Sequence, residues 1–183
     1  MPLSQPVPRE PAHRRQIECR GYRRADGLWD IEGHLVDTKS QPFENYHRGK
    51  VEPGVPVHEM WLRLTVDDEM RIHGVEAASD HFPFPLCPEV TPRFAALKGL
   101  KIGPGWLLDA RQHIGGVRGC THLVELLGPL ATTAFQTIYG GRQRRAAASG
   151  ERKKKPGILD SCHALRSDGE VVKRAWPEFY TGG

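Results

Sequence analysis

The chain has 183 residues, of which 38% are hydrophobic, and its formal net charge is +4. This length fits one domain of ordinary size with tails, and no apolar run reaches the roughly 18 residues needed to cross a bilayer. The first 15 residues hold four prolines and no apolar segment of a secretory signal. We therefore expect a cytoplasmic protein without a membrane segment. Its four scattered cysteines are too few for a disulfide scaffold.

The positive charge is concentrated in residues 140–157, which hold seven basic residues and one acidic residue, Glu151. The rest of the chain has 19 basic and 21 acidic residues, so the isoelectric point of about 9.0 reflects this one segment. Its Gly, Ala and Ser content is typical of a flexible linker. We expect it to tether two parts of the chain or to dock on an acidic partner protein. Nucleic-acid binding is disfavoured, because the segment lacks interleaved aromatic residues for stacking on bases.

The first half of the chain predicts two hairpins in series. An Ala25-Asp26-Gly27 turn joins the first pair of strands, and Asp67-Asp68 joins the second pair. Because side chains alternate along a strand, Asp37 ends an otherwise apolar face of the second strand. The polar residues 41–56 between the hairpins predict a loop. The expected strands cover residues 17–24, 28–38, 57–66 and 69–77.

The second half predicts helices. Thr91 is expected to cap a helix with Pro92 at its first position, and apolar spacing predicts a long helix from Cys120 or Thr121, kinked at Pro129. Strands followed by helices indicate an α+β fold, in which helices pack on one face of an antiparallel sheet. Further expectations are an irregular segment at 80–88, a short helix at 106–113, a helix end at Gly140-Gly141 and an extended segment at 157–176.

The expected organisation has a disordered N-terminal tail and one central domain, followed by the basic linker and a C-terminal extension that folds back on the domain. The ranges are 1–13 for the tail, 14–139 for the α+β domain, 140–157 for the linker and 158–183 for the extension.

Three places combine reactive side chains with the ends of predicted elements. They are Asp37 at the end of its strand, His81 with Cys87 in a proline-rich turn, and Cys120 with His122 at the start of the long helix. A helix N-terminus favours the thiolate form of cysteine, which binds metals. Zinc and iron accept mixed sulfur, nitrogen and oxygen ligands.

Structural interpretations of these residues stay open. Cys120 lies on an apolar stripe and fits a small buried residue, and Asp37 fits the end of a strand or a turn cap. The other histidines of this part of the chain are interpreted as surface or packing residues: His34, His47, His58, His73 and His113.

Two segments resemble the signature of an uncharacterised bacterial domain family. They are GYRRADGLWDI (residues 21–31), which continues to Asp37-Thr38, and GCTHL (residues 119–123), with the turn at 83–87 between them. The resemblance covers roughly residues 16–176, and the family carries no assigned activity.

The order of elements also resembles that of U-type iron–sulfur cluster scaffold proteins. In those proteins a carboxylate and thiols hold the cluster, and the resemblance assigns the corresponding positions to Asp37, Cys87, Cys120 and His122. Leu35 stands where the scaffolds have a further cysteine, and Thr121 separates a pair that is adjacent in them. With one thiolate fewer, the resemblance favours a single zinc or iron ion over an iron–sulfur cluster.

The leading hypothesis is therefore a metal-binding accessory protein that handles a metallocentre or sulfur for a partner enzyme. Its expected ligands are Asp37, Cys87, Cys120 and His122, with His81 in reserve. The first alternative is a small hydrolase or lyase, in which a metal-bound water reacts and Asp37 acts as general base. A metal-free variant would use Cys120 as nucleophile and His122 as base. Whether the protein is an enzyme is left open.

Overall fold

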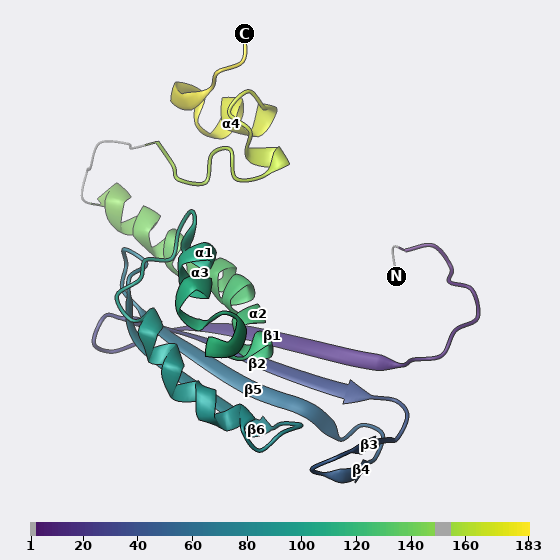
Figure 1. Cartoon of the computed structure of the whole chain (residues 1–183). Coiled ribbons are helices and arrows are strands. Elements are labelled where there is room, and N and C mark those ends of the chain that lie inside the picture. The colour runs from purple at the N-terminus through teal and green to yellow at the C-terminus, as the bar shows by residue number, and fades with distance from the viewer. Residues whose placement is uncertain (1–2, 149–154) are drawn as a thin grey trace. The chain divides into compact units, whose positions relative to one another are not determined.

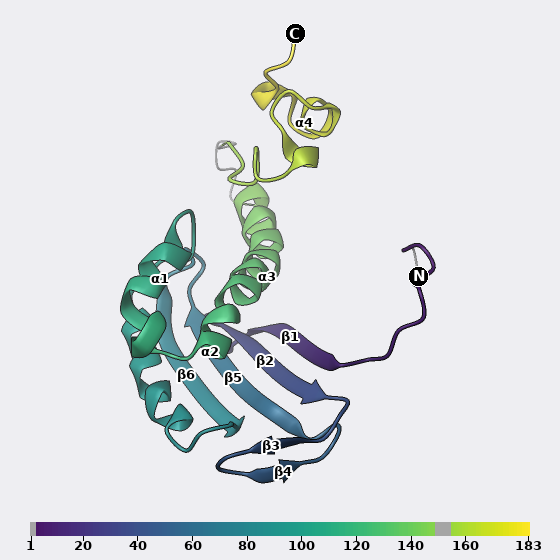
Figure 2. The ribbon, with the colours of Figure 1, turned by 45° about the vertical axis from the view of Figure 1, so that its right-hand side comes forward.

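The computed structural model describes residues 3–148 and 155–183. A four-stranded sheet forms the base of the first part of the chain, with every neighbouring pair antiparallel and the order β1-β2-β5-β6 (Figure 1). Helices lie over one of its faces (Figure 2). The prediction of an α+β fold with a sheet of two hairpins is confirmed. The strands are β1 (His13–Arg23), β2 (Trp29–Lys39), β5 (Pro56–Val66) and β6 (Ile72–His81).

The turns of the hairpins follow their sequence signals. Gly27 adopts a positive φ of 88° between β1 and β2, a conformation that glycine reaches without steric cost. The predicted loop at 41–56 is wrong in part, because it contains a small hairpin of β3 (Phe43–Asn45) and β4 (Gly49–Val51). The Asn45 side chain accepts hydrogen bonds from the backbone N–H groups of His47 and Arg48 and so closes the turn.

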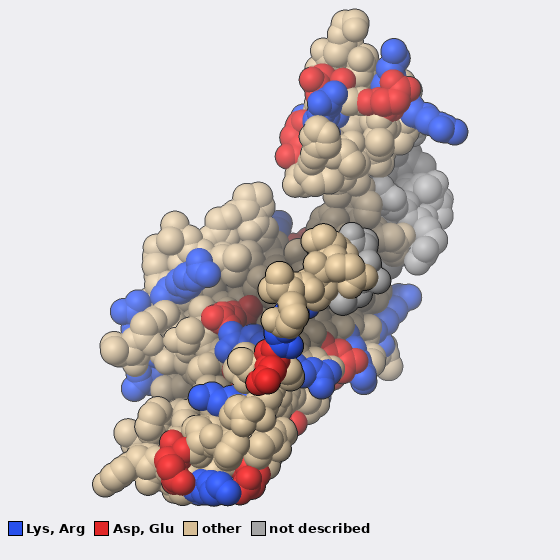
Figure 3. Space-filling view, turned by 90° about the vertical axis from the view of Figure 1, so that its right-hand side faces the viewer, with Lys and Arg blue, Asp and Glu red and all other residues tan. Residues whose placement is uncertain are grey.

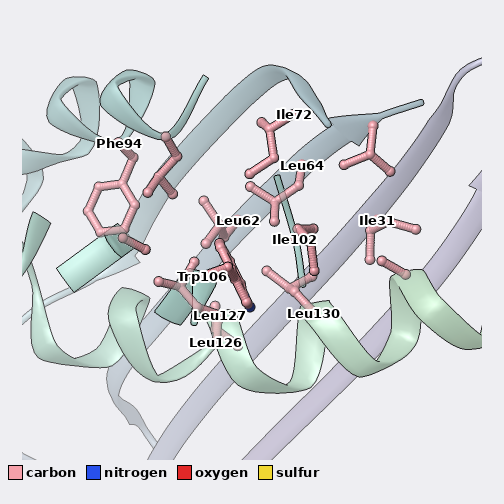
Figure 4. Packing of buried hydrophobic residues seen from close by; sticks show 14 of the residues in the cluster. Ile31, Leu62, Leu64, Ile72, Phe94, Ile102, Trp106, Leu126, Leu127 and Leu130 are labelled. Atoms are coloured by element: carbon pink, nitrogen blue, oxygen red, sulfur yellow. The ribbon is translucent and has the colours of Figure 1, made fainter. Parts of the chain in front are cut away.

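The core lies between the sheet and the helices (Figure 4). Ile31 and Leu35 of β2 and Leu62 and Leu64 of β5 are buried on the same side of the sheet, as alternation requires. Leu126, Leu127 and Leu130 meet them from the helices. The helices of this part are η1 (Cys87–Leu97) and η2 (Gly116–Arg118), both 3-10 helices, and α1 (Trp106–Ile114), α2 (Thr121–Glu125) and α3 (Leu127–Ala148).

The starts and ends of the helices differ from the sequence-based expectation. The predicted cap at Thr91 is wrong, since η1 already begins at Cys87 and the Thr91 hydroxyl donates to the carbonyl of Pro88 at 2.9 Å. The long helix is divided into α2 and α3 at Leu126, because Pro129 has no N–H to donate to the carbonyl of residue 125. Helix α3 also continues past Gly140-Gly141, where its end was expected.

Two glycines let α3 approach the sheet closely. A Cβ on Gly21 of β1 would lie 2.7 Å from Cγ2 of Thr137, and one on Gly33 of β2 would lie 3.2 Å from Cδ2 of Leu130. Close approach of the helix backbone holds the connected short helix α2 against the same face of the sheet. The sequence therefore places glycine where the two layers meet.

The described residues after 143 belong to a second compact unit. The extended structure expected at 157–176 is wrong, because this unit contains short helices around buried Val172 and Leu159. Asp160 accepts hydrogen bonds from the N–H and hydroxyl of Ser167. The expectation that the C-terminal extension folds back on the domain stays a prediction. Residues 149–154 of the basic segment lie outside the described residues. The helices are η3 (His163–Leu165), α4 (Glu170–Ala175) and η4 (Pro177–Phe179).

Two observations concern the described part of the chain as a whole. Among the described residues, no helix has both the length and the apolar character needed to span a membrane. On the described face drawn in Figure 3, acidic and basic side chains are interspersed.

Candidate metal centre

Three neighbouring strands place polar side chains in one row at the end of the sheet. Arg15 of β1 is opposite Asp37 of β2, and Asp37 is opposite His58 of β5. All three point to the helix-covered face, since they keep the alternation of the buried residues next to them. His122 of α2 approaches Asp37 from the helical layer. Four segments that are far apart in the sequence therefore meet at one carboxylate.

Asp37 is the centre of this group. Its side chain is only 1% exposed, and Arg15 donates to it in a bidentate manner, from Nε to Oδ1 at 2.8 Å and from a terminal nitrogen to Oδ2 at 2.7 Å. His13 Nε2 lies 3.2 Å from Oδ1. Burial alone would raise the pKa of Asp37, but the hydrogen bonds and charge of Arg15 outweigh burial and hold the pKa below its ordinary value. The carboxylate is therefore ionised.

Two imidazoles stand beside Oδ2 of Asp37. His58 Nδ1 is 3.2 Å from Oδ2, and His122 Nε2 is 3.8 Å from it. The two rings stack with their centroids 3.7 Å apart. Burial and the nearby His122 lower the pKa of His58 to about 4, and burial and the charge of Arg15 lower the pKa of His122. Both rings are consequently neutral at pH 7, which is the form that ligates metal ions.

One atom from each of Asp37, His58 and His122 lies within 4.8 Å of the other two. In a tetrahedral zinc site with bonds of about 2.0–2.1 Å, ligand atoms lie about 3.3 Å apart. The distances of 3.2 and 3.8 Å from Oδ2 are close to this separation. An imidazole nitrogen binds a metal along the plane of its ring, so coordination by both histidines would turn the stacked rings apart.

The surroundings of this triad supply further polar groups. Arg15 also pairs with Glu125, which follows His122 by three residues and lies on the same side of α2. Cys120 Sγ is 3.8 Å from Nδ1 of His122, the ring nitrogen on the other side from the one near Asp37. The site therefore has a charged rim and one thiol next to it.

The structure brings together only some of the residues expected from the sequence. Asp37 and His122 meet, and Cys120 contacts His122. Cys87 opens η1 and does not belong to the group of ligand atoms within 4.8 Å, among the described residues. The reserve ligand His81 instead pairs with Glu59 at 2.8 Å.

Sequence reasoning missed His58, which was interpreted as a surface or packing residue. A signal was present, because His58 precedes Met60 and Leu62 at the spacing of two that marks the buried face of β5. His13 and Arg15 were missed as well, since the first strand was expected to begin at residue 17 and in fact begins at His13.

The fold and this site define an α+β domain with a histidine and aspartate cluster suited to a metal ion. Residues 13–136, from the start of β1 into α3, match the family described as protein of unknown function (DUF2889). The match covers more than half of the chain, so the chain belongs to this family. The resemblance to an uncharacterised domain family is thereby confirmed. No curated protein and no solved structure matches the chain.

Proposed function

We propose that the domain binds a single zinc or ferrous ion through Asp37, His58 and His122. The observation that carries this proposal is the convergence of three ligand atoms from β2, β5 and α2 within 4.8 Å. Two histidines and one carboxylate suit both metals, as tetrahedral zinc or as the facial triad of non-haem iron. His58 takes the place that the sequence-based hypothesis gave to Cys87.

The same geometry favours one ion over an iron–sulfur cluster. Clusters are held mainly by cysteine thiolates, and Cys120 is the thiol that contacts a member of this group among the described residues. We assign Cys120 to hydrogen bonding with Nδ1 of His122, which would fix the ring so that Nε2 faces the metal. Partners of this kind orient metal-bound histidines in many sites.

A role in metal handling for a partner enzyme fits the way Arg15 holds Asp37. Structural zinc domains with four protein ligands are unfolded without their metal. Here the guanidinium of Arg15 neutralises the buried carboxylate when no ion is bound, so the metal-free protein can keep its fold. A protein that loads and releases an ion in the cytoplasm needs such a stable metal-free state. The basic segment at 140–157 would dock the acidic surface of the client.

Metal content tests the proposal directly. Protein purified without added metal and then dialysed against zinc or anaerobic ferrous ion should retain about one equivalent, and His58→Ala should retain less than a tenth of that. His34→Ala is the matched control, because His34 lies on the neighbouring strand β2 and faces the opposite side of the sheet. Equal retention by wild type and His58→Ala would refute the site. Two irons with acid-labile sulfide would instead indicate a cluster.

A metal-dependent hydrolase is the second candidate, and one observation favours it. Three protein ligands leave a fourth position for water, as in catalytic zinc sites, and Glu125 lies close enough to share the guanidinium of Arg15 with Asp37. Glu125 would then accept a proton from the water. Hydrolysis of activated esters or phosphoesters that needs the metal and is lost in Glu125→Gln, with metal retention unchanged, would support this candidate over metal handling.

A further inference from the structure

The face of the sheet opposite to the helices is open and carries excess negative charge. This face carries six carboxylates and four guanidinium groups, a formal net charge of −2. The acidic residues are Glu18, Asp30, Glu32, Glu59, Glu76 and Asp80, and the basic residues are Arg14, Arg20, Arg63 and Arg24, which follows β1 and pairs with Asp30.

A tryptophan stands on this face, and its orientation is fixed from two sides. Trp61 of β5 is 40% exposed. Its indole N–H donates to Asp80 at 3.0 Å, and one side of the ring stacks on His34 with centroids 3.6 Å apart and planes 7° from parallel. His34 is itself held by Glu59 at 3.0 Å. An exposed tryptophan with this many contacts is preorganised, so binding of a ligand to its ring costs little side-chain entropy.

A hollow of about 310 Å³ adjoins the ring of Trp61. It lies on the side of the ring away from His34, because the small residues Ala77 and Ala78 of β6 line it and His34 does not. Ala78 is directly opposite Trp61 in the strand register, and its short side chain leaves this space. The lining is completed by Leu62 and by three charged residues, Glu32, Arg63 and Glu76. Arg63 bridges the two carboxylates at 2.7 and 3.1 Å, so these three residues together carry one net negative charge.

We propose that this hollow binds an arginine side chain from an extended, basic segment of a partner protein. A guanidinium stacks on an indole face through cation–π attraction, and its planar donors match carboxylates better than an ammonium does. The free side of Trp61 would take the stacked cation. Glu76 is 74% exposed and accepts from Arg63 at Oε2, so its Oε1 would accept the outward N–H groups of the ligand. The net negative charge of the face attracts a basic segment and repels the phosphates of nucleic acid.

This proposal is independent of the metal centre, since the two sites lie on opposite faces of the sheet. The hollow is shallow and open, so a free small molecule would bury little of its surface there. A peptide adds contacts on both sides of its arginine along the strands. The partner is therefore identified by its chemistry as a flexible, arginine-bearing protein segment.

Titration of the full chain by two-dimensional ¹H–¹⁵N NMR tests the proposal. The probe is the acetylated and amidated pentapeptide Ala-Ser-Arg-Ser-Ala, and the control is the same peptide with citrulline, which has the shape of arginine without its charge. We expect saturable shifts of the Trp61 indole N–H and the Ala78 amide with the arginine peptide. Trp61→Leu should weaken binding about two- to fivefold, the range for an exposed cation–π contact.

Matched variants decide the outcome. Glu76→Gln should weaken binding of the arginine peptide. Glu52 is an exposed residue beside β4, and Glu52→Gln should leave this binding unchanged. Trp61→Phe keeps an aromatic face and serves as the second variant if Trp61→Leu does not fold. Equal binding of the citrulline peptide, equal loss in Glu52→Gln, or shifts that avoid Trp61 would each overturn the proposal. Tighter binding of an oligonucleotide would overturn it too.

Discussion

The environment of Asp37 makes a quantitative prediction for Arg15→Gln. This change removes the guanidinium from a carboxylate that is 1% exposed. Removing one partner of a buried ion pair costs about 3–5 kcal/mol. Arg15 itself is one-third exposed, so solvent screens part of the interaction, and we expect a loss of about 2 kcal/mol in the free energy of unfolding. For a chain of this size the melting temperature should fall by about 4–8 °C.

Arg63→Gln is the matched control for this prediction. Arg63 also bridges two carboxylates, but Glu32 and Glu76 are 30% and 74% exposed, so its loss should cost about 0–1 kcal/mol. The assay is urea unfolding of metal-free protein at pH 7, followed by circular dichroism. Saturating zinc should stabilise Arg15→Gln more than wild type, because the ion supplies the missing positive charge. Equal losses in the two variants, within about 0.5 kcal/mol, would refute the assignment of Asp37 as a buried, Arg15-neutralised carboxylate.

Three further predictions concern the pH dependence, the thiol and the helix packing. The pKa of His58 is about 4 in the folded state and about 6.5 in the unfolded state. As the pH falls, the unfolded chain therefore binds a proton before the folded one does. The free energy of unfolding of the metal-free protein should fall by up to about 3 kcal/mol between pH 6.5 and pH 4. In thermal melts, the melting temperature should depend less on pH in His58→Gln than in wild type, and it should depend on pH as in wild type in His47→Gln. The cobalt-substituted protein should lack the near-ultraviolet charge-transfer band of a thiolate ligand. Cys120→Ala should weaken metal binding about 10–100-fold. A strong band in wild type that is lost in Cys120→Ala would instead make Cys120 a direct ligand. Gly21→Ala should destabilise the protein by about 1–3 kcal/mol through overlap with Thr137, and Thr137→Ala in the same chain should recover part of the loss in urea unfolding.

Local patterns were sufficient for the two hairpins of the sheet, β1–β2 and β5–β6, because a short turn joins the two strands of each. Alternation in β2 and β5 and the Asp-Gly turn determine pairing between neighbours in sequence. The helices were harder to delimit. Pro92 was interpreted as the first residue of a helix, yet η1 starts at Cys87, and Leu126 rather than Pro129 marks the break between α2 and α3. The β3–β4 hairpin was missed because its strands have three residues each, too short for a periodic signal.

For the candidate site, the sequence by itself identified Asp37 at the end of an apolar strand face and the segment with Cys120 and His122 at a helix start. These are local properties, since they depend on spacing within one element. Only the tertiary structure decided which histidine joins them. His58 reaches Asp37 because β2 and β5 pair in one particular register, and that register joins residues 18 to 37 positions apart in the sequence. Metal ligation requires atoms to converge in space, a property that spacing along one chain does not determine.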